Sequence, residues 1–140
     1  MQTIANEKRV GITIPAKSEF VGLARLAVAG MARDSEIDEQ IIDDMKIAVS
    51  EVGNNIVNNA AGNSEASLSM ELIIDDQALV VEITCSSRDL EAAALAPILW
   101  PDEPGQPMGL AIISALSDKV ELDTTSPEHT ILRLIKYLWV

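Results

Sequence analysis

The segment from Asp38 to Ala60 limits most strongly what this chain can fold into, because its apolar residues recur at steps of three and four. At about 100° per residue, this spacing places them on one face of an α-helix. The residues of that face are Ile41, Met45, Ala48, Val49, Val52 and Ile56. Gly62 follows and suits the end of a helix. A helix with one apolar face needs a second layer to cover it.

Two further helices are predicted, one before this segment in the sequence and one after it. The first covers residues 17–33, "KSEFVGLARLAVAGMAR", where Ser18 can cap the helix and Glu19 suits its first turn. The other covers residues 107–116, and Pro107 suits its first turn. Both carry apolar residues at helical spacing, so we expect them to pack on the same core.

Alternating and β-rich segments predict a sheet. "VGITIPA" reads as a short strand that stops at Pro15, "ASLSMELIID" and "ALVVEIT" as one hairpin, and "KVELDTT" and "TILRLIKYLW" as another. The segment 85–108 has an Ala-rich stretch and three prolines, which predicts one long loop with a possible helical turn.

This order of elements is too irregular for a doubly wound parallel sheet. We therefore expect an α/β (α+β) two-layer sandwich, with helices on one face of a largely antiparallel or mixed sheet, as a single domain over residues 1–140. The predicted core consists of Ile41, Met45, Val52, Ile56, Leu72, Val81, Ile83, Ile112 and Leu134.

Charge and cysteine content exclude several classes of function. Twenty-two acidic against ten basic residues give a net charge of -12, which repels a nucleic-acid backbone, and no basic cluster offsets it. Cys85 is the only cysteine and His129 the only histidine, so neither an internal disulfide nor a structural zinc site is expected. Without a signal peptide or an apolar run of about 18 residues, we expect a cytoplasmic protein that does not enter a membrane.

The end of the long predicted helix is unusually rich in short amides. Its sequence, "SEVGNNIVNNAAGN", places Glu51, Asn55 and Asn59 at or beside the apolar face. Glu51 and Asn55 are one turn apart, so a carboxylate and an amide oxygen could together hold a water molecule and a metal ion. By spacing alone, however, Glu51 could also be a solvated edge charge and the asparagines a fraying helix end.

Two separated stretches resemble a known family. "IPAKSEFVGLARLAVAGMA" with "IIDDMKIAVSEVGNNIVNNA", and later "PMGLAIISALSDKVELDTTSPEHTILRLIKYL", resemble the anti-sigma factor serine kinases of the RsbW type. These kinases share a superfamily with gyrase, histidine-kinase and mismatch-repair ATP-binding domains. The resemblance covers roughly residues 10–138. It implies the histidine-kinase-like ATPase fold, ATP and Mg²⁺ as cofactors, and a homodimer.

The resemblance also implies roles for individual residues. Glu51 matches the general base that acts on a substrate serine, and Asn55 matches the ligand of the magnesium that bridges the ATP phosphates. Asn59 would then face the nucleotide pocket as well. Arg25 matches a family arginine on the surface that grips the sigma factor and its antagonist, although it could equally be a snorkelling arginine with a solvated head.

The chain departs from the family pattern at its nucleotide contacts. Cys85 stands where the family has an aspartate that accepts from the adenine amino group, and Ser87 stands at the following glycine. A thiol is a poor acceptor and cannot replace a carboxylate. In the second glycine motif Gly109 is kept, but Pro107 has no N–H to donate. Thr130 matches a threonine that supports the missing aspartate.

Two functions from different classes follow. In the first, the protein is a binding module: an anti-sigma regulatory factor that sequesters a sigma factor and is countered by a STAS-type anti-anti-sigma partner, with weakened or lost nucleotide binding. In the alternative, it is an active ATP-dependent serine kinase that phosphorylates that STAS partner. The altered positions Cys85 and Ser87 favour the binding module, whereas the retained Glu51 and Asn55 favour the kinase.

Overall fold

The computed structural model describes residues 7–87, 89–92, 94 and 109–138 of the chain. Its elements are β1 (Lys8–Pro15), α1 (Ser18–Asp34), α2 (Glu39–Asn59), β2 (Ser67–Ile74), β3 (Ala78–Cys85), α4 (Gly109–Leu116), β4 (Lys119–Asp123) and β5 (Ile131–Tyr137). Residues 89–92 and 94 have helical backbone as well, and we call them the post-β3 segment.

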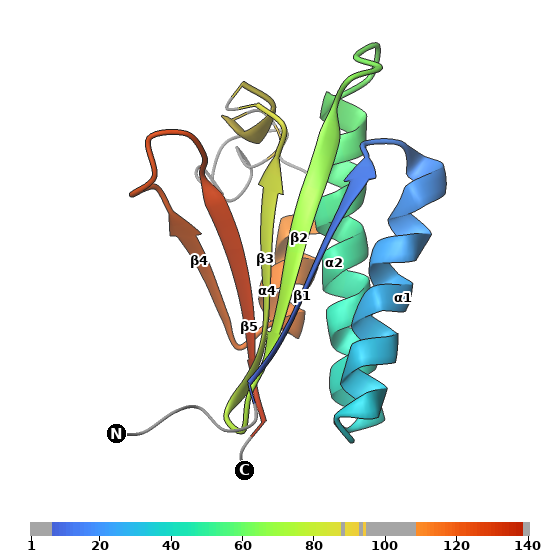
Figure 1. The fold of residues 1–140 in the computed structure, drawn as a ribbon, viewed down its shortest axis with the longest axis vertical. Helices are drawn as coiled ribbons and strands as arrows, with labels where there is room; N and C mark the ends of the chain where they lie inside the picture. The colour runs from blue at the N-terminus through green and yellow to red at the C-terminus, as the bar shows by residue number, and fades with distance from the viewer. Residues whose placement is uncertain (1–6, 88, 93, 95–108, 139–140) are drawn as a thin grey trace.

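The five strands form one antiparallel sheet in the order β1-β2-β3-β5-β4. Helices α1, α2 and α4 all lie on one side of this sheet, so the molecule has two layers (Figure 1). The strand residues that face the helices alternate with outward ones, as in Leu68, Met70, Leu72 and Ile74 of β2. None of the described elements covers the other face of the sheet. The predicted fold class is therefore confirmed.

The core lies between the sheet and α2. Of the residues predicted to form it, Met45, Val52, Ile56, Leu72, Val81, Ile83 and Leu134 are buried. Ile41 is half-buried at its edge. The prediction for Ile112 is wrong, because this side chain is 36% exposed while Ile113 is buried. Neighbouring residues of a helix differ by about 100° in direction, and the segment is too uniformly apolar for its sequence to show which one faces the sheet.

The helix ends agree with the sequence in one case and differ in another. Ser18 does not cap α1, because the N-cap position belongs to Lys17 and no side chain caps this helix. Helix α2 ends at Asn59, and Gly62 in the following turn has a φ of 85°, a left-handed conformation that glycine adopts without strain. Pro107, expected in the first turn of the last helix, lies outside the described residues. That residues 1–140 form a single domain stays a prediction.

The elements that carry the expected site meet at one end of the molecule. The C-terminal end of α2, the end of β3, the start of β5 and the post-β3 segment all lie there (Figure 1). In the part of the chain that the structure describes, no helix is both long and apolar enough to cross a bilayer.

Candidate functional site

Glu51 and Asn55 lie on consecutive turns near the C-terminal end of α2, and both side chains are half-buried. Their neighbours Val52 and Ile56 are buried in the core and fix the rotation of the helix. Gly53 allows α1 to approach closely here, since a Cβ at this position would lie 3.2 Å from Cγ1 of Val21. The helix therefore presents Glu51 and Asn55 one above the other from a rigidly packed support.

The carboxamide of Asn55 has a defined orientation. Its Nδ2 donates a hydrogen bond to the backbone carbonyl of Ala94 in the post-β3 segment. A carbonyl only accepts, so Nδ2 must face Ala94, and Oδ1 has no hydrogen-bond partner among the described residues. Asn59, one turn further, is exposed, and its Nδ2 donates to the carbonyl of Asn55 at 2.8 Å. Asn59 is thus turned back onto its own helix.

Cys85 ends β3 with its side chain buried among core residues. Burial raises the pKa of the Cys85 thiol to about 12, because the thiolate would lose its water, and the nearby Glu91 carboxylate raises it further by repulsion. The group at the position of the expected adenine contact is therefore a neutral thiol. Such a group accepts hydrogen bonds poorly.

Among the described residues, Glu91 is a functional candidate that the sequence did not reveal. Its side chain is 1% exposed, yet its carboxylate accepts from the backbone N–H of Cys85 at 3.0 Å and of Thr130 at 2.9 Å. His129 Nδ1 lies 3.0 Å from the same carboxylate and can donate a third hydrogen bond. Glu91 stands in an Ala-rich stretch with no motif around it, so nothing in the sequence marks it as buried.

The remaining positions that the family resemblance assigns to nucleotide contacts lie on three different parts of the chain. Thr130 is half-buried just before β5, and Ser87 is exposed after β3, where its Oγ accepts from the N–H of Leu90 at 3.2 Å. Gly109 is the first residue of α4. The loop that would complete a phosphate cradle before Gly109 lies outside the described residues. The structure thus joins Cys85 and Thr130 through Glu91 and joins Asn55 to the post-β3 segment.

Arg25 lies on the exposed side of α1 and contacts α2. Its Nη1 donates to Ser50 Oγ at 3.3 Å, and Ser50 Oγ in turn donates to the carbonyl of Lys46 at 2.8 Å. Ser50 directly precedes Glu51, so the arginine is tied to the helix that carries the expected base.

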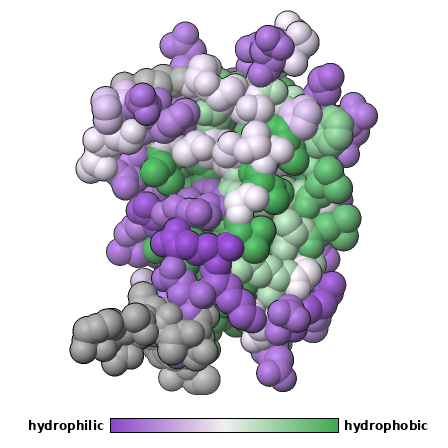
Figure 2. Space-filling view, viewed as in Figure 1, coloured by the Kyte–Doolittle hydropathy of each residue, from purple (hydrophilic) through white to green (hydrophobic). Residues whose placement is uncertain are grey.

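Around Arg25 the surface is unusually apolar. Leu23 is 48% and Leu26 is 68% exposed, and Figure 2 shows hydrophobic residues gathered along the flank where α1 lies. A shallow hollow of about 450 Å³ in this region is lined by Glu19, Gly22, Leu23, Arg25, Leu26 and Lys46. We call these six residues the α1 surface. A positive group among exposed leucines is a combination typical of protein–protein contacts.

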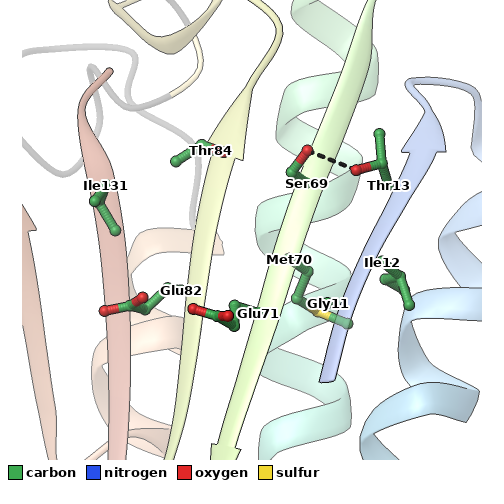
Figure 3. Close-up of a pocket in the computed structure, with 9 residues that line it drawn as sticks. All are labelled: Gly11, Ile12, Thr13, Ser69, Met70, Glu71, Glu82, Thr84 and Ile131. Carbon is green, nitrogen blue, oxygen red and sulfur yellow. Dashed lines mark hydrogen bonds between the residues drawn. The ribbon is translucent and has the colours of Figure 1, made fainter. Parts of the chain in front are cut away.

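A second hollow, of about 350 Å³, lies at the sheet (Figure 3). Glu71 and Glu82 are paired across β2 and β3 beside it, and Thr13 and Ser69 share a hydrogen bond of 2.9 Å. Arg9 and Arg133 neutralise the two glutamates through ion pairs of 3.0 and 2.7 Å. Neither Glu51 nor Asn55 lines this hollow.

We call Glu51 and Asn55 on α2 the helix half of the site, and the end of β3 with the start of β5 the strand half. The helix half has side chains of the kind that metal-dependent phosphoryl transfer uses. Glu51 supplies a carboxylate, and Asn55 presents an amide oxygen one turn away. Among the described residues no group of three or more histidine, cysteine, aspartate or glutamate side chains could hold a metal ion by itself. A single amide ligand suits magnesium, which keeps several waters and binds mainly through substrate phosphates.

Comparisons with known proteins identify the family of the chain. The family described as the histidine kinase-like ATPase domain matches residues 14–136. A serine-protein kinase RsbW from Halalkalibacterium halodurans is 34% identical over 138 residues, which covers 92% of this chain and 83% of that protein. The protein of the same name from Listeria monocytogenes is 29% identical over 123 residues, covering 81% of this chain and 78% of the relative.

A solved structure has a similar fold. The crystal structure of the RsbU and RsbW domains of a Mycobacterium tuberculosis protein matches with a TM-score of 0.64. The match covers 94% of this chain and 32% of that chain, at 16% sequence identity. At this identity the likeness concerns the fold alone.

Proposed function

The chain belongs to the histidine kinase-like ATPase family and groups with its RsbW-type serine-protein kinases, and we propose that it is an anti-sigma regulatory factor with weakened nucleotide binding. In this proposal it sequesters a sigma factor in the cytoplasm and is countered by a STAS-domain anti-anti-sigma partner. The observation that carries the weakened nucleotide binding is the neutral, buried thiol of Cys85 at the position of the adenine contact.

The α1 surface is the part of the molecule that supports partner binding. Covering exposed leucines with a partner favours binding, and a guanidinium among them can pair with a partner carboxylate. The hydrogen bond from Arg25 to Ser50 holds the guanidinium near α2, which lowers the entropy that binding costs. We expect the sigma factor and the STAS partner to compete for this surface.

The strand half of the site, where Cys85 takes the place of the adenine contact, favours weak nucleotide binding. In a site with an aspartate, a charge-assisted hydrogen bond to the base is worth about 1.5 to 3 kcal/mol, so its loss lowers affinity by roughly ten- to more than a hundredfold. The Glu91 carboxylate does not compensate, since it already accepts from two backbone N–H groups and lies next to His129. Selectivity for adenine over guanine should fall together with affinity.

The alternative function, an active serine kinase, is favoured by the helix half of the site. Bound magnesium would neutralise and align the phosphates of ATP, and Asn55 is placed to hold it through Oδ1. Glu51, one turn away, can take the proton of a substrate serine. Residual phosphorylation of a STAS partner should therefore require Mg²⁺ and disappear in Glu51→Ala.

Calorimetric titration of the full chain with Mg–ATP and Mg–GTP tests both functions, together with binding to individually purified sigma factors. We expect weak, poorly selective nucleotide binding and tight binding to one sigma factor. Micromolar, adenine-selective binding of Mg–ATP would contradict the weakened site. Undetectable nucleotide binding with tight sigma-factor binding would contradict the kinase. A monomer in sedimentation at working concentration would remove the expected homodimer.

A further inference from the structure

We propose that Glu91 is a positioning residue that orients the magnesium ligand Asn55 through the post-β3 segment. The inference rests on the proposed role of Asn55 in the site. Three links carry it: the contacts of Glu91 with the sheet, the packing of the post-β3 segment, and the hydrogen bond from that segment to Asn55.

The first link is the position of the Glu91 carboxylate between two strand ends. The ladder between β3 and β5 ends at the pair of Ile83 and Leu132. Beyond this pair, Glu91 Oε2 accepts from Cys85 N and Oε1 accepts from Thr130 N. The carboxylate thus bridges the two strands where their own hydrogen bonding has stopped. Hydrogen bonds to an ionised group are the stronger kind, and burial shields these from water.

The second link is the packing of the post-β3 segment. Leu90 and Ala94 are buried in the same core as α2 and the sheet, at 7% and 1% exposed. Ser87 holds the start of the segment, because its Oγ accepts from Leu90 N and its carbonyl accepts from Glu91 N at 3.1 Å. Glu91 and Ala94 are three positions apart in a helical segment, so they share a side of it. In the proposal, a shift at Glu91 moves the backbone of Ala94 through this short helical segment.

The third link reaches the metal ligand. The terminal torsion of an asparagine side chain has a broad, roughly two-fold preference, so without a fixed partner the amide of Asn55 could turn either atom toward a ligand. The carbonyl of Ala94 removes this freedom, since it accepts from Nδ2 only. Some residues orient a metal ligand without touching the metal. Mutating such residues commonly lowers metal affinity by 10- to 100-fold.

The test uses Glu91→Gln in the full chain. Glutamine keeps the shape of the side chain but turns an amide N–H toward one of the two backbone donors, so one of the two strand contacts is lost. Glu128→Gln is the matched control, since it makes the same substitution at an exposed position beside His129.

The first readout needs no nucleotide. In the wild-type protein we expect the side-chain amide protons of Asn55 to be protected from solvent exchange, with a scalar coupling through the hydrogen bond to the carbonyl carbon of Ala94. In Glu91→Gln this protection and coupling should be lost while the backbone spectrum stays folded, and Glu128→Gln should leave both unchanged. An unprotected Asn55 amide in the wild type would overturn the proposal even if Glu91→Gln does not fold. Unchanged Asn55 protection in a folded Glu91→Gln would overturn it as well.

The second readout is the affinity for a non-hydrolysable ATP analogue, titrated at several Mg²⁺ concentrations. We expect Glu91→Gln to lower the magnesium-dependent affinity about tenfold. The same change added to Asn55→Ala should have almost no effect, because the two residues act as one unit. Fully additive losses would overturn the proposal. If the wild type binds no analogue at all, the proposed nucleotide site fails, while the amide protection still decides whether Glu91 positions Asn55.

Discussion

The two halves of the candidate site hold their polar groups in opposite ways. On α2, Glu51 and Asn55 project side chains from a regular helix, and Asn55 Oδ1 accepts no hydrogen bond from the described residues. At the ends of β3 and β5, the carboxylate of Glu91 satisfies the backbone N–H groups of Cys85 and Thr130 from within the chain. In the proposed function the helix half serves phosphate and metal chemistry, whereas the strand half uses its carboxylate for contacts within the chain.

In the proposed function, the strand half has lost its contact to the base while the fold is kept. The buried positions of β3 and α2 that hold the layers together are apolar and do not depend on what the site binds. A polar contact to the base can therefore be replaced by an internal one, provided that every buried donor still finds an acceptor. Five predictions test this comparison.

The largest expected effect is on the reactivity of Cys85. Its pKa in the folded chain is about 12, against a usual value of 9.0, so at pH 8 its thiolate is about a thousandfold rarer than in an unfolded chain. We expect native protein to react with a thiol-specific disulfide reagent about a thousandfold more slowly than protein in urea. Equal rates would show that the strand half is open.

The same pKa has a consequence for stability. Because the folded pKa lies above the unfolded one, the contribution of the Cys85 thiol is complete below pH 9 and is lost as the pH rises toward 12. Cys85→Ala should therefore lose less stability than the wild type over this range, as measured by urea unfolding at each pH.

The second effect concerns Glu91→Ala. This change leaves two backbone N–H groups at the strand ends without their acceptor and removes a buried side chain. We expect the free energy of unfolding to fall by about 3 kcal/mol. Urea denaturation followed by circular dichroism measures it. Glu128→Ala, at an exposed position, should change it by less than about 0.5 kcal/mol, and a similar small loss in Glu91→Ala would contradict the internal role of the carboxylate.

The third effect concerns partner binding, which we expect to depend on the α1 surface and not on either half of the site. Arg25→Ala should weaken binding of the sigma factor by about 2 kcal/mol while the fold stays intact, because a guanidinium among exposed leucines is a typical hot spot. Arg33→Ala removes the same charge from the same helix and serves as the control. Surface plasmon resonance compares the two variants, and equal affinities would remove Arg25 from the interface.

The smallest effect comes from returning an acceptor to the strand half. Cys85→Asn supplies a neutral amide oxygen, which avoids repulsion from the nearby Glu91 carboxylate. One neutral hydrogen bond is worth about 1 kcal/mol, so ATP affinity should rise about fivefold while GTP affinity does not. Cys85→Ala, which supplies no acceptor, should show no gain. A gain in both variants would mean that space, and not an acceptor, limits binding.

Much of the fold could be predicted from the sequence, because its signals are local. The spacing of Met45, Val52 and Ile56 defines α2 and its buried face, and alternation in β2 and β3 defines which strand residues face the helices. Predictions were wrong where local patterns were degenerate. Ile112 and Ile113 are adjacent in a uniformly apolar helix, and Ser18 stands one position inside α1 and not at its cap.

The candidate site was predictable only in part. Glu51 and Asn55 are one turn apart on a helix that the sequence defines, and their proximity follows from this spacing alone. The role of Glu91 depends on contacts with Cys85, six residues earlier, and with His129 and Thr130, almost forty residues later. No periodic pattern can report a contact between segments so far apart in the chain.

The sequence by itself thus determined the layers, the apolar faces and the pair of polar groups on α2, since each of these depends on residues within a few turns of one another. Only the tertiary structure decided that Nδ2 of Asn55 turns to Ala94, that the pKa of the Cys85 thiol is raised, and that a glutamate from an alanine-rich stretch joins β3 to β5. The physical reason is burial: a carboxylate or thiol behaves according to the donors and the water around it, and folding alone brings those donors together and removes the water.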